Sequence, residues 1–107
     1  EAEQLNIIDN RLADLAQRAS ELRGIFDYDQ KADQLKTVAR ELEDPAVWDN
    51  AERAQELGRE RRSLENVVLT LNRVADSLRD TGELFAMARE EDDDETLSAV
   101  AADIDGI

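Results

Sequence analysis

Apolar residues recur along this chain with the spacing of an α-helix. From Leu5 to Leu22 they follow one another in steps of three and four residues, which is the heptad seam of a coiled coil. Four further stripes have helical spacing: 32–42, 54–78, 84–88 and 97–104. The pattern predicts an all-α fold, an antiparallel helical bundle or coiled-coil hairpins of about four helices, with the last helix truncated.

Turn residues predict where the first helices begin and end. Gly24 suits a left-handed cap after the first helix, and Asp27 can cap the second helix. The second helix is expected to end at Asp44, because Pro45 disfavours the α conformation in the residue before it. Asn50 can then cap the third and longest helix.

The last third of the chain contains two further segments that predict an interruption of the helices. Asp80-Thr81-Gly82 predicts a break or kink in the long third helix. The run Glu90–Glu95 consists of acidic residues only. We expect it to form a solvent-exposed loop whose last acids cap the final helix.

Composition narrows the classes of function. The chain has 27 acidic and 13 basic residues, a net charge of −14, which disfavours nonspecific binding to DNA or RNA and to anionic membranes. There is no bilayer-spanning apolar run and no signal peptide, so we expect a soluble cytoplasmic protein. The chain lacks both cysteine and histidine, the usual zinc ligands, and histidine is also the usual general base. We therefore expect a binding module without catalytic residues, cofactor or metal.

The acidic run has part of the residue spacing of a calcium-binding loop. Asp92 and Asp94 have the first spacing of an EF-hand, but its sixth and twelfth positions require Gly and Glu. Those positions hold Leu97 and Asp103, so the match fails. A solvated loop is the favoured interpretation, and a recognition patch for a basic partner is the alternative.

Arg59, Arg61 and Arg62 form the one basic cluster in the sequence. They could contact RNA phosphate, or they could pair within the helix as Glu56–Arg59 and Arg61–Glu65. Each such pair contributes about 0.3–0.5 kcal/mol. We favour pairing for Arg59 and Arg61, and the role of Arg62 stays open.

Three aromatic residues lie near the predicted turns. Trp48 follows Pro45 and is expected to plug one end of the bundle. Phe26 and Tyr28 lie in the first turn, where aromatic side chains are less obliged to be buried. If exposed, they are the best contact candidates in the chain.

Three segments resemble a known family. Leu22-Arg23-Gly24-Ile25-Phe26-Asp27-Tyr28-Asp29 resembles the first inter-helix turn of the bacterial peptide chain release factor 2 family. Glu41-Leu42-Glu43-Asp44-Pro45-Ala46-Val47-Trp48 resembles its second turn, and Glu52–Arg61 resembles the start of its third helix. The resemblance covers essentially all 107 residues. It is limited to the N-terminal helical domain of the family, since the codon-reading Ser-Pro-Phe and hydrolytic Gly-Gly-Gln motifs do not occur in this chain.

The resemblance implies a role in translation termination. Such factors act on the ribosome at UGA or UAA stop codons and trigger hydrolysis of peptidyl-tRNA. Residues 1–107 would be a single, non-catalytic N-terminal domain of a larger factor. Its partners would be the ribosome, at stalk-base proteins and nearby rRNA, and the GTPase release factor that recycles decoding factors. The alternative is a stand-alone acidic coiled-coil adaptor that dimerises through Leu5–Leu22.

Helix order suggests where the partners would bind. If successive helices run in opposite directions, the turn Gly24–Asp29 and the acidic run Glu90–Glu95 lie at one end of the bundle. The N-terminus, the Trp48 turn and Ile107 then lie at the other end. The hypothesis is that the shared tip binds partners. Its candidate residues are Gly24, Ile25, Phe26, Asp27, Tyr28, Asp29, Asp92, Asp93 and Asp94.

Overall fold

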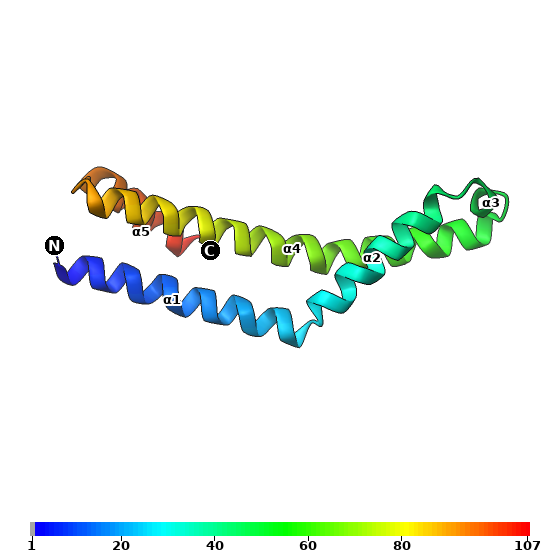
Figure 1. Ribbon diagram of the computed structural model, residues 1–107, viewed down its shortest axis with the longest axis horizontal. Helices are drawn as coiled ribbons and strands as arrows, with labels where there is room; N and C mark the ends of the chain where they lie inside the picture. Colours follow the sequence, from blue (N-terminus) through cyan, green and yellow to red (C-terminus); the bar gives the residue numbers. More distant parts are fainter. Residues whose placement is uncertain (1) are drawn as a thin grey trace. The chain divides into compact units, whose positions relative to one another are not determined.

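The computed structural model describes residues 2–107, and every regular element in that range is a helix (Figure 1). This confirms the predicted all-α fold. Among the described residues, no helix has both the length and the apolar character that a membrane span requires. The elements are α1 (Ala2–Ile25), α2 (Tyr28–Glu43), α3 (Pro45–Trp48), α4 (Ala51–Glu90) and α5 (Asp94–Asp105).

The chain divides into two compact units. Unit 1 comprises the described residues up to Glu21 together with Arg73–Ile107, and unit 2 comprises Leu22–Asn72. The long helix α4 contributes its first part to unit 2 and its second part to unit 1. Each unit therefore has its own share of the apolar stripes.

Unit 1 packs the start of α1 and all of α5 against the second part of α4. Its core residues are Ile8, Phe85, Ala88, Leu97, Val100 and Ile104. Leu5, Leu12 and Leu15 of the heptad seam pack against this core. An ion pair of 2.7 Å between Arg11 and Asp105 also joins α1 to α5. This part of the seam is therefore occupied within the chain, whereas the dimerising adaptor would leave it free.

Unit 2 packs α2 against the first part of α4. Its buried cluster consists of Val38, Leu57 and Leu64. Leu35, Leu42 and Val47 are partly buried against these three residues. The predicted apolar stripe of the second helix therefore faces the predicted stripe of the third. The two units thus have separate cores built from the same kind of periodicity.

The α1–α2 turn differs from the predicted glycine cap. Gly24 lies inside α1, and among the described residues no glycine has a positive φ. The left-handed residue is Asp27, with φ 50°. Asp27 does occupy the N-cap position of α2, but its side chain makes no capping hydrogen bond. The helical bond from the Phe26 N–H to the Leu22 carbonyl, at 3.0 Å, carries the helical turn past Gly24.

The break predicted at Asp80-Thr81-Gly82 is wrong, because α4 continues through these residues to Glu90. Thr81 is buried, and the apolar stripe continues beyond it with Phe85 and Ala88 in the core of unit 1. Gly82 has no positive φ, so it does not act as a helix terminator. Packing of the stripe outweighs the weak local preference for a turn.

The other predicted helix boundaries are confirmed. Asp44 is extended, with φ −74° and ψ 118°, between α2 and α3. The Asn50 Oδ1 accepts a hydrogen bond of 3.1 Å from the Arg53 N–H at the start of α4. The predicted connector Ala46-Val47-Trp48 belongs to the one-turn helix α3, whose first residue is Pro45.

Trp48 does not plug the end of the bundle. Its side chain is 62% exposed, and its indole N–H donates a 2.8 Å hydrogen bond to the Leu42 carbonyl. A tryptophan that satisfies its one donor at the surface can leave most of its ring in water. The unit 2 core beside α3 is instead reached by Val47.

Candidate partner-binding surfaces

The α1–α2 turn, Gly24–Asp29, holds its two aromatic residues in different environments. Tyr28 is half-buried, and the Arg23 guanidinium lies 3.8 Å from its ring centroid. The Tyr28 O–H donates a hydrogen bond to the Asn72 Oδ1 on α4. Both the face and the polar end of this ring are therefore engaged within unit 2.

Phe26 remains available for contact. Its side chain is 43% exposed, and the Lys31 Nζ lies 5.7 Å from its ring centroid. Phe26 lines a groove of about 340 Å³ whose other lining residues come from α4: Asn66, Val67, Thr70 and Leu71. Of the two aromatic contact candidates, Phe26 is the one whose ring borders a groove.

The α4 wall of this groove was missed by sequence reasoning. Asn66 and Thr70 are polar residues on a long helix, and nothing in their local pattern distinguishes them from a solvated face. The Tyr28–Asn72 hydrogen bond joins residues 44 positions apart. These α4 residues lie near the α1–α2 turn because α2 packs against α4. Only knowledge of that packing could have identified them.

The acidic turn, Glu90–Glu95, connects α4 to α5. Asp92 is left-handed, with φ 52°. The Asp93 carboxylate accepts hydrogen bonds from the Thr96 N–H at 3.1 Å and from the Thr96 hydroxyl at 2.6 Å. The hydroxyl bond first, and then the backbone bond, hold the pKa of Asp93 below its ordinary value of 3.8.

The predicted cap on the last helix is therefore confirmed, and it is made by Asp93. Because this carboxylate is engaged at the N-terminus of α5, it is less available to a partner than its neighbours. Asp92 and Asp94 have exposed side chains on either side of it. Of the three candidate acids, these two present free negative charge to solvent.

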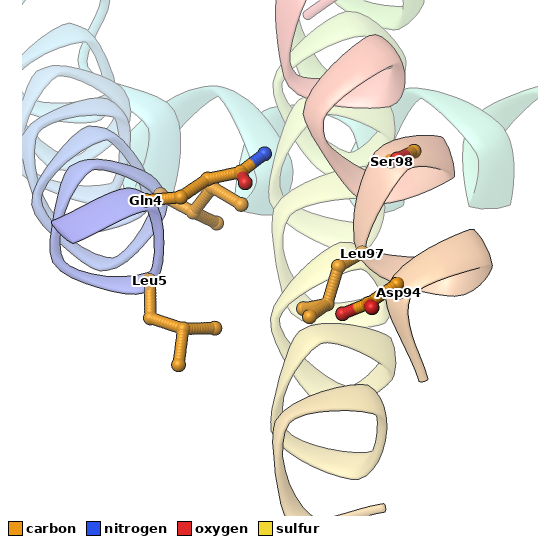
Figure 2. Close-up of a pocket in the computed structure, with 6 residues that line it drawn as sticks. Gln4, Leu5, Asp94, Leu97 and Ser98 are labelled. Carbon is orange, nitrogen blue, oxygen red and sulfur yellow. The ribbon is translucent and has the colours of Figure 1, made fainter. Parts of the chain in front are cut away.

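The acidic turn lies beside the start of α1. Asp94, Leu97 and Ser98 of α5 line a cavity of about 200 Å³ together with Gln4 and Leu5 of α1, as the close-up shows (Figure 2). The alternating arrangement placed the acidic run at the end opposite to the N-terminus, and this expectation is wrong. The reason is that α5 folds back on α4 and packs against Ile8, so its first turn lies next to the first turns of α1.

The basic cluster on α4 is partly engaged in ion pairs. Arg61 pairs with Glu65 at 2.7 Å, as predicted. Glu56 pairs with Arg53 at 3.6 Å rather than with Arg59, because Arg53 is held beside it by a second bond to Glu41. Within residues 2–107, Arg59 and Arg62 form no ion pair.

The two candidate surfaces present different chemical groups. The α1–α2 turn presents an aromatic face beside an apolar groove, and the acidic turn presents carboxylates. No three His, Cys, Asp or Glu side chains of the described residues converge on a position that could hold a metal ion. Asp93, whose pKa is lowered, is a helix cap in contact with Thr96.

Comparison with known proteins defines the class. Residues 31–106 match the PCRF domain, and this span includes α3, α4 and α5 and most of α2. The chain therefore belongs to the PCRF domain family. The predicted family resemblance is confirmed by individual relatives, which are named peptide chain release factor 2.

Three of these relatives illustrate the similarity. The proteins from Burkholderia pseudomallei strain 1106a and Burkholderia cenocepacia are each 53% identical to this chain over 103 residues. The protein from Acidovorax sp. strain JS42 is 48% identical over 103 residues. Each alignment covers 96% of this chain and 28% of the relative. The chain thus spans little more than a quarter of the length of the relatives it matches.

Proposed function

We propose that this chain is the N-terminal accessory domain of a cytoplasmic translation termination factor. The whole factor would direct hydrolysis of peptidyl-tRNA at UGA and UAA stop codons on the ribosome. The observation that carries the proposal is 53% identity over 96% of the chain to proteins named peptide chain release factor 2. The match to the PCRF domain over residues 31–106 also supports it.

The domain would serve the factor without performing the chemistry. Its single proline follows Asp44 and no two glycines are adjacent, so neither Ser-Pro-Phe nor Gly-Gly-Gln is present in this chain. In the family that this chain resembles, those two motifs read the codon and promote hydrolysis. The contribution of residues 1–107 would therefore be to position the factor and to couple it to its partners.

The proposed partners are the base of the ribosomal stalk and the GTPase release factor. A chain with a net charge of −14 is repelled by exposed RNA phosphate, so basic ribosomal proteins are the better electrostatic match. The contact candidates are Gly24, Ile25, Phe26, Asp27, Tyr28 and Asp29, and separately Asp92, Asp93 and Asp94. The exposed side chains of Asp92 and Asp94 support the second group.

A chimera tests the proposal. The matching segment of the Burkholderia cenocepacia release factor 2 is replaced by this chain, and peptide release is measured on ribosomes halted at UGA, UAA or UAG. The chimera is expected to release peptide at UGA and UAA but not at UAG. The 107-residue chain alone is expected to release none. Loss of release by the chimera, with the parent factor active, would contradict the proposal.

Charge reversal then tests the acidic turn within the active chimera. Asp92→Lys together with Asp94→Lys is expected to weaken the response to the GTPase release factor or the affinity for the ribosome, on the order of tenfold if both acids meet basic groups. Glu52→Lys together with Glu83→Lys is the matched control, since it makes the same change in charge at two exposed positions of α4. Equal behaviour of the variant and its control would exclude the acidic turn as a contact surface.

A further inference from the structure

The groove beside Phe26 has the construction of a docking site for a side chain. Its walls are apolar where Phe26, Val67 and Leu71 meet, and Asn66 and Thr70 add polar groups. Its volume of about 340 Å³ exceeds that of one large aliphatic side chain. An apolar groove with a few polar groups on its wall is the usual form of a helix-binding or peptide-binding surface.

Two further exposed apolar side chains lie at the end of α1, close to Phe26 in the sequence. Leu22, Ile25 and Phe26 are spaced as i, i+3 and i+4, which places them on one helical face. Ile25 is 71% exposed, and Leu22 and Phe26 are about as exposed as each other. Exposed apolar residues on one helical face are a common feature of surfaces that bind partners.

Cationic side chains lie beside the α1–α2 turn that borders the groove. The Lys31 Nζ lies 5.7 Å from the Phe26 ring centroid, and Arg23 lies over the Tyr28 ring of the same turn. Arg62 precedes Asn66 by one helical turn on α4 and forms no ion pair within residues 2–107. Asp27 and Asp29 are the acids of the turn itself. Cationic side chains therefore lie next to the aromatic residues of this turn, although the chain as a whole has a net charge of −14.

We propose that the groove docks an amphipathic protein segment with apolar anchor residues flanked by Asp or Glu. The apolar anchors would fill the space between Phe26 and Leu71. The flanking carboxylates would meet Lys31 and Arg62, which gives complementarity in charge as well as in shape. This inference does not depend on the proposed role in termination.

A protein segment fits these observations better than RNA or a second copy of the chain. The groove is lined mainly by aliphatic carbon, and one face of its single aromatic ring is already approached by Lys31, which leaves a poor stacking platform. Two copies with a net charge of −14 each would repel one another. Both alternatives become outcomes of the test.

The test is a selection with matched variants. A phage library of random 16-residue peptides is selected on the 107-residue chain and counter-selected on the empty support. The variant Thr70→Glu is not used in the selection and is kept for the later measurements. Thr70 has an exposed side chain, so this substitution fills the groove with charge and leaves the core of unit 2 intact. The enriched peptides are expected to be net acidic, with apolar residues at helical spacing.

The affinities of the enriched peptides are then measured by fluorescence anisotropy. Thr70→Glu and Lys31→Glu are each expected to weaken binding about tenfold or more, as hot-spot substitutions do. Gln55→Glu on α4 and Lys36→Glu on α2 make the same charge changes at exposed positions that do not line this groove. These two controls are expected to bind as the original chain does.

Four outcomes of the peptide experiments, and one of sedimentation, would overturn the proposal. The selection would contradict it if no peptides were enriched or if the enriched peptides were net basic. The affinity measurements would contradict it if the variants and their controls lost binding equally. Tighter binding of a labelled mixed-sequence RNA than of the enriched peptides would also contradict it. Sedimentation equilibrium tests whether a second copy of the chain occupies the groove. A dimer that Thr70→Glu dissociates would assign the groove to self-association instead.

Discussion

The two units use the same helical periodicity but depend on different contacts. Unit 1 surrounds Phe85 with three helical segments and has six buried residues in one cluster. Unit 2 also has six buried apolar residues, but only three of them form one cluster, and it adds contacts at its two ends. Arg53–Glu41 joins α2 to α4 near α3, and Tyr28–Asn72 joins them beside the α1–α2 turn. A two-helix unit whose buried residues do not all join one cluster needs such end contacts more than a three-segment unit does.

The distribution of charge differs just as clearly. Residues 1–21 and 73–107 contain 16 acids and 5 bases, a net charge of −11, whereas residues 22–72 contain 11 acids and 8 bases, a net charge of −3. The unit whose buried residues form one cluster therefore also has the stronger negative field. Unit 1 is suited to electrostatic steering by its surface, and unit 2 is suited to close apolar contact.

The largest effect is expected from the centre of unit 1. Phe85→Ala should lower the free energy of unfolding by about 3–5 kcal/mol, because it removes a buried ring and leaves a cavity. Met87→Ala is the control, since Met87 lies on the same helix but is 59% exposed. Urea unfolding followed by circular dichroism measures both. Similar losses in the two variants would show that Phe85 is not central to the core.

The next largest effect is expected in unit 2. Leu57→Ala should destabilise by about 2–5 kcal/mol, since Leu57 is fully buried between α4 and α2. Because the cluster around it is small, we expect α2 to lose hydrogen-exchange protection while α5 keeps it. Leu69→Ala, at an exposed position of the same helix, is the control. Equal loss of protection in α5 would mean that the two units unfold as one.

Much of the fold could be predicted from the sequence because periodicity and strong local signals coincide. The cap at Asn50 and the stop at Asp44-Pro45 rest on bonds within a few residues, and both are confirmed. Asp80-Thr81-Gly82 failed as a break because Thr81 and Phe85 are packed in the interior. The local preference for a turn is outweighed by the burial of these side chains. That burial depends on tertiary packing, which the local sequence does not show.

The candidate surfaces were predictable in part. Phe26 and the acids of the acidic turn are visible as exceptions to the helical pattern. Their neighbours are not, because Asn72, Thr70 and Leu5 reach these positions through packing between distant helices. The end at which the acidic turn lies depends on how α5 folds back, which the order of helices does not specify.

A smaller effect is expected from the ion pair at the α3 end of unit 2. Arg53→Ala removes contacts to Glu41 and Glu56, whose side chains are substantially exposed, so the loss should be about 0.2–1 kcal/mol. The difference should disappear in 1 M salt, where such charges are screened. Arg62→Ala is the control without an ion pair among the described residues. A salt-independent loss at Arg53 would point to packing of its aliphatic stem instead.

The smallest effect is expected from the titration of Asp93 in unit 1. Its pKa in the folded chain lies below the ordinary value, since the Thr96 hydroxyl and N–H stabilise the carboxylate. The contribution of this cap to stability is therefore complete above about pH 4 and is lost as the pH falls through the lowered pKa. Asp93→Asn keeps a capping oxygen but does not titrate in this range, so it isolates the effect from other acids. Hydrogen exchange of the first turn of α5 should depend more steeply on pH in the original chain than in Asp93→Asn. Identical pH profiles would show that the Asp93–Thr96 contacts do not favour the carboxylate, and the first turn of α5 would then depend on the core of unit 1 alone.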